Sequence, residues 1–187
     1  MNEWRLFPEG TVPEFTRPEW YAGRERAPHL EQPDHGERLR VTAHFAKLVA
    51  AGLNLDSVTD LGCGDGGLLS LLPEMARVGY DLCPANVEAA RAERGVAAVL
   101  LDVVNEPDRI QWGGLVICTE MLEHLADPHG LLRLVAANAR AVVASSPLNE
   151  DDKTHYEFHA WAWDMAGYRA MFTAAGFEVT IHAPAAG

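Results

Sequence analysis

The sequence has few cysteines, no long apolar run and no leader-like N-terminal pattern. Its 187 residues include three cysteines, an odd number, and no Cys-x-x-Cys pair. Neither a disulfide framework nor a cysteine-rich zinc site is expected, so we interpret the cysteines as reduced thiols of a cytoplasmic protein. No stretch approaches 18 uninterrupted apolar residues, which predicts no membrane span. The N-terminal residues lack the basic-then-apolar order of a signal peptide.

Basic residues are also scarce. The chain has 15 Lys and Arg against 27 Asp and Glu, a formal net charge of −12. Because phosphate contacts need clustered Lys and Arg, nucleic acid is not an expected partner. One or two arginines can still hold a small anionic substrate. Apolar residues make up 48% of the chain, which suits one soluble globular domain with a full core.

Residues 1–34 combine many prolines with many aromatic rings. Prolines at this density exclude a long regular element, and aromatic side chains are scarce in disordered tails. We interpret the segment as an irregular arm or lid over a domain of residues 35–187. The arm either only covers core surface or forms one wall of a substrate pocket. Its prolines are Pro8, Pro13, Pro18, Pro28 and Pro33, and its rings are Trp4, Phe7, Phe15, Trp20, Tyr21 and His29.

Beyond residue 34, apolar patterns of strand length alternate with patterns of helix length. This alternation predicts an α/β, Rossmann-like fold: a mostly parallel, doubly wound sheet with helices on both faces. Ligands of such sheets bind beyond the carboxyl ends of the strands. The expected strands are 57–61, 76–81, 96–101, 114–118, 141–144 and 177–182. The expected helices are 34–52, 67–72, 85–94, 128–139 and 164–175.

A glycine-dense turn follows the first expected strand. Gly62, Gly64 and Gly66 permit backbone angles that other residues avoid and let a ligand lie against the main chain. The helix that begins near Gly67 points free N–H groups and the positive end of its dipole at the same place. A nucleotide-like cofactor is therefore expected at this turn.

Two cofactors compete for this turn. Residues 62–67 satisfy the pattern G-x-G-x-x-G, and Asp81 lies at a distance that suits ribose binding, as in NAD sites. In contrast, Asp60 and Asp65 would repel a pyrophosphate. These carboxylates suit a cofactor with a cationic or ammonium end.

Three motifs resemble those of class I S-adenosylmethionine (SAM)-dependent methyltransferases, in the same order, and the resemblance covers residues 37–182. Asp60-Leu61-Gly62-Cys63-Gly64-Asp65-Gly66 resembles the first motif and Gly79-Tyr80-Asp81-Leu82-Cys83-Pro84 the second. Asp102-Val103 resembles the position that contacts adenine. Cys83 departs from the family, which usually has Ser or another capping residue there, and cysteine caps a helix poorly.

The resemblance implies SAM as the cofactor. Asp60 and Gly62 would contact its methionine part. Asp81 would bind the ribose and Asp102 the adenine amino group. The full set of implied cofactor-binding residues is Asp60, Gly62, Gly64, Asp81, Leu82, Asp102, Val103 and Glu120.

A second polar stretch follows the fourth expected strand, beside the expected methyl group. Glu120, Glu123 and His124 stand at i, i+3 and i+4, which on a helical turn puts them on one side. Two carboxylates and an imidazole suit a divalent cation such as Mg, Mn or Zn. The alternative is a metal-free site, in which His124 is structural or acts as a general base.

This stretch is similar to that of ubiquinone-biosynthesis O-methyltransferases, which share Glu-Met-Leu-Glu-His. It also resembles Hen1-type RNA 2′-O-methyltransferases, in which Glu-x-x-Glu-His and a later histidine bind metal. Here the later histidine would be His159 or His155, and His159 is the better match because an aromatic segment follows it. The implied metal ligands are Glu120, Glu123, His124 and His159, and the catalytic candidates are Glu120, His124 and His159.

We therefore expect a SAM-dependent O-methyltransferase that acts on a small-molecule hydroxyl of a phenol, catechol or sugar. One alternative is a Hen1-like RNA 2′-O-methyltransferase, which the acidic charge and small size disfavour. Another is a SAM- or nucleotide-binding regulatory protein without turnover. The family usually has a seventh strand in an antiparallel hairpin. Here either that hairpin is shortened or a partner chain covers the sheet edge, as in a homodimer.

Overall fold

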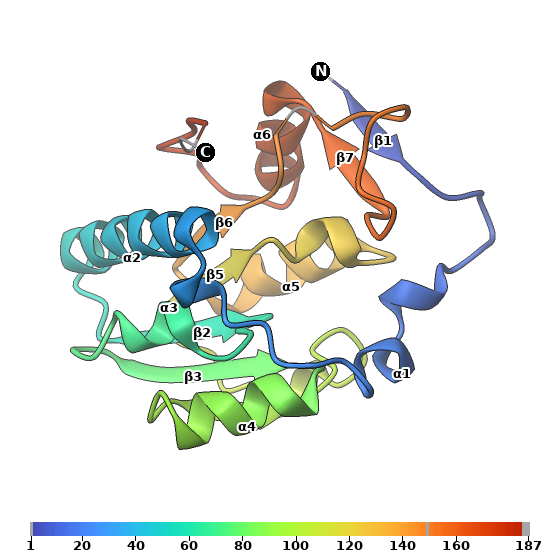
Figure 1. Cartoon of the computed structure of the whole chain (residues 1–187). Helices are drawn as coiled ribbons and strands as arrows, with labels where there is room; N and C mark the ends of the chain where they lie inside the picture. Colours follow the sequence, from blue (N-terminus) through green and yellow to red (C-terminus); the bar gives the residue numbers. More distant parts are fainter. Residues whose placement is uncertain (1, 149, 185–187) are drawn as a thin grey trace.

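The main feature of the structure is a five-stranded parallel sheet (Figure 1). This computed structural model describes residues 2–148 and 150–184. The strand order is β4-β3-β2-β5-β6, and each neighbouring pair is parallel. The chain order reverses between β2 and β5, which makes their carboxyl ends a topological switch point. The strands are β2 (Ser57–Leu61), β3 (Ala76–Asp81), β4 (Ala97–Leu100), β5 (Leu115–Thr119) and β6 (Ala141–Ser145).

Helices cover both faces of this sheet. Side chains of α2 and α4 pack in the cluster on one face, and those of α5 and α6 pack on the other. No described helix is long and apolar enough to cross a membrane. The α-helices are α1 (Pro18–Tyr21), α2 (Pro33–Leu53), α3 (Gly67–Ser70), α4 (Pro84–Ala92), α5 (Pro128–Asn138) and α6 (Met165–Ala174). The 3-10 helices are η1 (Glu14–Thr16), η2 (His29–Glu31), η3 (Pro107–Arg109) and η4 (Leu122–His124).

Local sequence sets the ends of these helices. Pro33 occupies the first turn of α2, where its missing N–H group costs nothing. Asn54 ends α2 in the left-handed region, at φ 52°. Asp127 and Asp164 cap α5 and α6 by accepting the backbone N–H three residues later, at 2.8 and 2.6 Å. Cys83 makes no side-chain cap at the start of α4, as its chemistry predicts.

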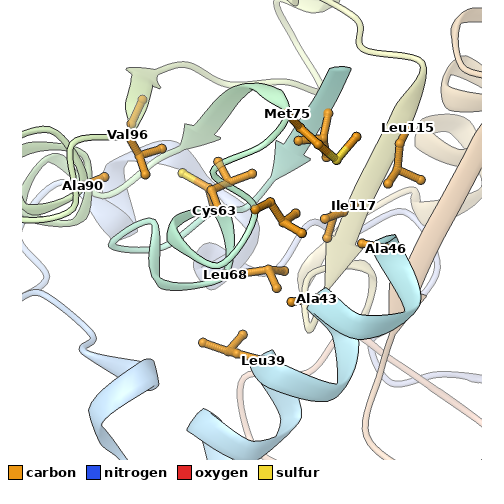
Figure 2. Packing of buried hydrophobic residues seen from close by; sticks show 14 of the residues in the cluster. Leu39, Ala43, Ala46, Cys63, Leu68, Met75, Ala90, Val96, Leu115 and Ile117 are labelled. Carbon is orange, nitrogen blue, oxygen red and sulfur yellow. The ribbon is translucent and has the colours of Figure 1, made fainter. Parts of the chain in front are cut away.

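The sheet divides the core into two clusters, and the side chains of β5, the strand beside the central β2, alternate between them. Leu115 and Ile117 face the cluster that α2 completes (Figure 2), whereas Val116 and Cys118 face the cluster of α5 and α6. All four side chains are fully buried. A strand that is covered on both faces must be apolar throughout, which explains the continuous apolar run.

The doubly wound α/β fold is confirmed. The five strands of the sheet, together with α2, α4, α5 and α6, lie within two residues of their predicted bounds. The strand predicted at 177–182 is wrong, because this segment is irregular and pairs with no described strand. Phe177 and Val179 still pack against the core. The carbonyl of Val179 accepts a hydrogen bond from the Arg169 guanidinium at 3.2 Å, and not from the backbone N–H of a neighbouring strand.

An N-terminal arm, residues 2–32, runs beside the sheet. Its first segment, β1 (Glu3–Arg5), pairs antiparallel with β7 (Trp161–Trp163), and the sequence predicted neither strand. Glu3 accepts the Trp163 indole N–H at 2.7 Å and lies 2.9 Å from Nε2 of His129. The arm then runs down the side of the molecule to α1 and returns to α2 (Figure 1).

Candidate active site

A cavity of about 480 Å³ lies at the carboxyl ends of β2, β3 and β5. This volume is within the usual range for small-molecule sites. The sheet forms one side of the cavity, and the arm, with residues such as Trp20 and Tyr21, forms another. The predicted residues that line it are Asp60, Gly62, Gly64, Asp81, Leu82, Asp102, Val103, Glu120 and His124.

The glycine turn after β2 has the backbone conformation that its sequence predicts. Gly62, Gly64 and Gly66 have φ angles of 76°, 54° and 75°, which residues with a Cβ rarely adopt. A Cβ on Gly64 would meet nothing within 4 Å. A Cβ on Gly62 would lie 3.2 Å from the side chain of Met121. Gly64 therefore leaves open space in the cavity for a ligand to approach the main chain.

Asp81 joins the end of β3 to the glycine turn. Its Oδ2 accepts the N–H of Gly64 at 2.8 Å, and its Oδ1 accepts the N–H of Cys83 at 2.8 Å. Asn86 donates a further hydrogen bond to Oδ1 at 3.3 Å. Burial raises the pKa of Asp81, while these hydrogen bonds act in the opposite direction. The carboxylate is thus held rigidly at the cavity wall.

Asp60 is a buried carboxyl group that lacks a full set of partners. It is 1% exposed, and its Oδ1 has no hydrogen-bond partner among the described residues. Burial, followed by the nearby charge of Asp81, raises the pKa of Asp60 well above its usual value. An unpartnered buried oxygen is costly, so its position on the cavity wall suits a ligand that brings a hydrogen-bond donor.

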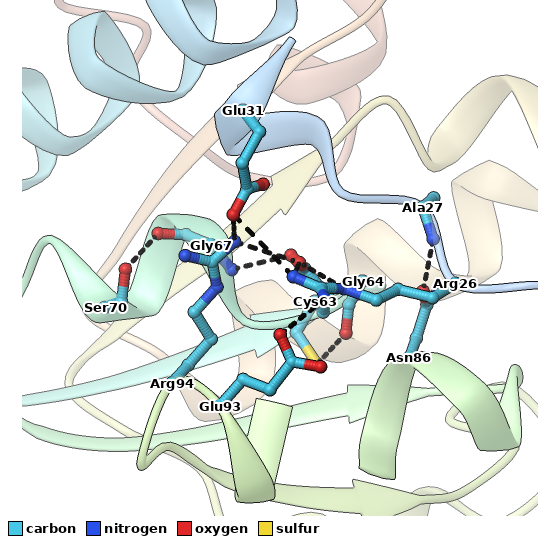
Figure 3. Close-up of polar contacts among 11 residues, drawn as sticks. Arg26, Ala27, Glu31, Cys63, Gly64, Gly67, Ser70, Asn86, Glu93 and Arg94 are labelled. Carbon is cyan, nitrogen blue, oxygen red and sulfur yellow. Dashed lines mark hydrogen bonds and ion pairs between the residues drawn. The ribbon is translucent and has the colours of Figure 1, made fainter. Parts of the chain in front are cut away.

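Asp65 has a different role from the expected one. Its Oδ2 accepts Arg26 at 2.7 Å and Arg94 at 3.1 Å, and its Oδ1 accepts the N–H of Gly67 at 3.1 Å (Figure 3). Two guanidinium groups therefore neutralise this buried carboxylate, which removes it as an attractor for a cationic cofactor. The helix expected at 67–72 is also shorter, because α3 is a single turn. The dipole of so short a helix can contribute little to the binding of a ligand.

The same network attaches the arm to the sheet. Arg26 also pairs with Glu93 at the end of α4, and Arg94 also pairs with Glu31 of the arm. Nearby, the N–H of Ala27 donates to Oδ1 of Asn86 at 2.9 Å (Figure 3). Together with the β1–β7 pairing, these contacts fix the arm at both ends.

Asp102 follows β4 and accepts hydrogen bonds from its own loop. Its Oδ1 accepts the N–H groups of Val104 and Asn105 at 3.0 and 3.1 Å, and its Oδ2 accepts the Asn105 side chain at 2.7 Å. These bonds hold the turn in which Val103 is buried against the cavity. The main chain and the carboxylate of this turn are the groups that it offers to a ligand.

Glu120 directly follows β5 and has a strained backbone conformation, with φ 50°. Its carboxylate accepts the Ser145 hydroxyl at 2.7 Å and pairs with Nη1 of Arg38 at 2.5 Å. The Nε of Arg38 is buried and has no partner among the described residues. Left-handed glutamate is uncommon and costs free energy, and such strain concentrates at functional sites.

Glu123, His124 and His159 converge beside this pair. One potential ligand atom from each of the three side chains lies within 4.8 Å of the others. The Oε2 of Glu123 accepts Ser146 at 3.1 Å, whereas its buried Oε1 has no partner among the described residues. Glu120 stays outside this group because it pairs with Arg38. His155 also stays outside, exposed, with Nδ1 3.1 Å from the carbonyl of Asp151.

The two histidines of this cluster are oriented through their Nδ1 atoms. His124 Nδ1 lies 2.9 Å from the carbonyl of Phe158, and since a carbonyl only accepts, we assign the proton to Nδ1. His159 Nδ1 lies 2.6 Å from Oε2 of Glu150. Burial and the neighbouring His159 lower the pKa of His124 to about 4, so its imidazole is neutral at pH 7.

Sequence reasoning missed two residues of this site, Arg38 and Glu150. The signal for Arg38 was topological. A helix that precedes β2 and runs antiparallel to it brings its first turns to the carboxyl edge of the sheet, and Arg38 lies in those turns. Glu150 lies in an irregular polar loop, where no periodicity indicates which side chain turns inward.

Comparison with known proteins identifies the family of this chain. A family model described as a methyltransferase domain matches residues 31–182. The ubiquinone biosynthesis O-methyltransferase of Xanthomonas axonopodis pv. citri (strain 306) is 39% identical over 103 residues, which cover 49% of this chain and 41% of that protein. The chain thus matches less than half the length of this relative.

Two solved methyltransferases share the fold. Magnesium protoporphyrin IX methyltransferase (ChlM) from Synechocystis PCC 6803, with bound SAH, gives a TM-score of 0.63 at 16% identity, over 87% of this chain and 84% of that one. The methyltransferase domain of bacterial CtHen1-C gives a TM-score of 0.58 at 19% identity, over 74% of this chain and 81% of that one. Because the family model covers most of the chain, the chain belongs to the methyltransferase domain family, as a class I SAM-dependent methyltransferase.

Proposed function

We propose that this protein methylates a hydroxyl group of a small molecule, such as a phenol, catechol or sugar, with SAM as the donor. The observation that carries the proposal is that the glycine turn and His124 line one cavity. A donor on the turn and an acceptor near the histidine would therefore share one enclosed space. Positioning of this kind supplies much of the rate of a methyl transfer.

The proposed cofactor contacts follow from charge. The methionine part of SAM carries an ammonium and a carboxylate group, and when bound SAM supplies an electrophilic methyl group. Asp60, buried with a free oxygen, suits the ammonium group. Arg38, which lines the cavity and whose buried Nε has no partner among the described residues, suits the carboxylate. Asp81 suits the ribose hydroxyls, and Asp102 with Val103 suits the adenine.

An acceptor hydroxyl must also lose its proton. With Nδ1 directed at the Phe158 carbonyl, His124 keeps the lone pair of Nε2 available as a proton acceptor. His159 is held by Glu150 in the same way, and the two rings lie 4.8 Å apart. We therefore assign proton removal to His124, with His159 beside it.

As an alternative to His124 as the base, we propose a divalent cation at Glu123, His124 and His159, which would take up the lone pair of His124 Nε2. The observation that supports it is the buried Oε1 of Glu123, which has no partner among the described residues and lies in a group of mixed oxygen and nitrogen ligands. Mg, Mn and Zn accept such ligands. A cation held there would lower the pKa of the acceptor hydroxyl. Arg38 competes for Glu120, so Glu120 is left out of this ligand set.

The test uses the purified full chain with SAM and a panel of catechols, sugars and an RNA oligonucleotide, and mass spectrometry detects an added methyl group. We expect a methylated small molecule, and tight binding of SAH by calorimetry. Absence of SAH binding would contradict the cofactor proposal. Methylation of the RNA alone would favour the Hen1-like alternative, and SAH binding without any product would favour a regulatory protein.

The cation has its own test. We expect exhaustive chelation to abolish activity and added Mn²⁺ to restore it, and we expect metal analysis of the purified chain to find a bound divalent ion. Full activity of the chelated protein would leave His124 as a metal-free base. The acidic net charge and the three free, buried thiols support a cytoplasmic enzyme of small molecules. Sedimentation of the full chain would test whether a homodimer covers the sheet edge.

A further inference from the structure

Aromatic rings from two distant segments form the acceptor side of the cavity. Trp20 of the arm lies 5.0 Å from Phe158, and Phe15 of the arm lies 5.9 Å from the same ring. Tyr156 lies 5.3 Å from Phe158 and 5.3 Å from His159. These edge-on and tilted contacts lead from the arm to His159, and Trp20, Tyr156 and Phe158 among the rings line the cavity. Such an aromatic wall favours a flat aromatic ligand.

Two arginines of the arm line the same cavity without an acidic partner. Arg17 and Arg24 form no ion pair with any described residue, although the protein carries a net charge of −12. Arg26, two residues further on, pairs with Asp65 and Glu93. In so acidic a chain, two unpaired arginines on one cavity wall carry positive charge that an anionic ligand can neutralise.

The position of Arg24 is defined by an aromatic ring. Its guanidinium carbon lies 3.9 Å from the centre of the Trp20 ring, a cation–π arrangement that does not use its N–H groups as hydrogen-bond donors. Among the described residues, the Arg17 guanidinium donates only to the carbonyl of Val12, at 3.3 Å. The planar N–H fork of arginine matches a carboxylate, with two parallel hydrogen bonds.

The remaining charges of the cavity limit the ligand to a small anion. Its wall also carries six carboxyl groups; Asp65 and Glu120 pair with arginines, and those of the others that are ionised would repel a polyanion. A single carboxylate can reach the arginines at the rim while the rest of the molecule stays neutral. The carboxyl groups are Glu25, Asp60, Asp65, Asp81, Asp102 and Glu120.

We propose that the methyl acceptor is an aromatic hydroxyl compound that carries a carboxylate, which Arg17 and Arg24 bind while its ring lies on Trp20 and Phe158. This inference rests on the proposed function and names its substrate class. The carboxylate end lies at the arm, and the hydroxyl end points toward His124.

The experiment measures binding to the full chain saturated with SAH, by calorimetry. The probes are 3,4-dihydroxybenzoate, 4-hydroxybenzoate and caffeate, each paired with its neutral methyl ester, together with catechol and uridine 5′-monophosphate. We expect each acid that binds to do so at least ~10-fold more tightly than its ester, the scale of one charge-assisted hydrogen bond. The double variant Arg17→Met/Arg24→Met should lose this preference, and Arg24→Lys should keep part of it.

Arg5→Met is the matched control, because Arg5 also belongs to the arm and stacks on a ring, Phe7, but does not line the cavity. It should keep the preference for the acids. Equal binding of acids and esters, binding of no acid, tighter binding of the nucleotide, or a preference that survives in the double variant would each overturn the inference. SAH binding is read separately, so its loss would instead count against the proposed function.

Discussion

Asp81 and Gly64 are joined by a hydrogen bond of 2.8 Å between the carboxylate Oδ2 and the backbone N–H. The bond connects the end of β3 to the turn after β2, across two neighbouring parallel strands. It gives Asp81 two tasks, because the same carboxylate that shapes the glycine turn also faces the cavity. The residue that we propose binds the cofactor is thus also the residue that shapes the candidate site.

Replacing Asp81 should therefore weaken cofactor binding strongly. A hydrogen bond to a charged group contributes ~1.5–3 kcal/mol, so Asp81→Ala should weaken SAH binding by roughly ten- to a hundredfold. Titration calorimetry measures this change. Asp56→Ala is the control, since Asp56 is exposed at the opposite end of β2. An unchanged dissociation constant in Asp81→Ala would contradict the assignment of the ribose to this carboxylate.

The Asp60 carboxyl group should lower the stability of the folded protein and strengthen its binding of SAM. Its folded pKa is raised, so between pH 4 and the folded pKa the unfolded chain releases a proton that the folded chain retains. Stability is therefore present at low pH and lost as pH rises. Asp60→Asn removes this loss and should raise the free energy of unfolding at pH 8 by ~1–3 kcal/mol, with a smaller gain at pH 4.5.

Thermal unfolding of the SAH-free protein at both pH values measures the effect of Asp60→Asn. The same variant should bind SAM less tightly, because the amide cannot attract an ammonium group. A variant that is less stable than the parent at pH 8 would show that the Asp60 carboxylate has a partner that the geometry does not account for.

The fold and the placement of most candidate cofactor residues at one cavity could be predicted because their signals are local. Gly62 and Gly64 need left-handed angles that the sequence itself reveals, and Asp81 ends a strand whose period is visible. The role predicted for Asp65, to attract a cationic cofactor, was wrong because its partner Arg26 lies 39 residues away. No sequence pattern describes the path of the arm that carries Arg26. Motifs fix where a carboxylate lies, but its partners depend on tertiary packing.

The segment 177–182 shows a second limit. Its alternation of apolar and polar residues predicted a strand, but only Phe177 and Val179 pack against the core, whereas Ile181 is exposed. Alternation reports burial on one face, whereas a strand also needs a neighbour with free N–H and C=O groups. Whether such a neighbour lies in reach is decided by the rest of the chain.

The arm should stabilise the protein through the ion pairs of Asp65. Arg26→Met leaves this carboxylate, which is 2% exposed, with Arg94 as its remaining guanidinium partner, and we expect a loss of ~1–3 kcal/mol in the free energy of unfolding. Urea titration measures it. Arg109→Met removes an exposed pair with Glu106 and should cost less than ~0.5 kcal/mol. Equal losses in the two variants would contradict a special role for the Asp65 network.

Gly79 should be the position in β3 that tolerates least change. A Cβ there would lie 2.5 Å from the Sγ and 2.6 Å from the Cβ of Cys63, which belongs to the glycine turn. Because the turn must then shift, Gly79→Ala should lower the free energy of unfolding by ~1–3 kcal/mol and also weaken SAH binding. Gly52→Ala is the matched control, since its Cβ would meet nothing within 4 Å near the end of α2, and it should be neutral or stabilising. Paired urea and calorimetric titrations test both effects. If Gly79→Ala were as stable as Gly52→Ala, β3 and the turn would be less tightly packed than the distances to Cys63 indicate.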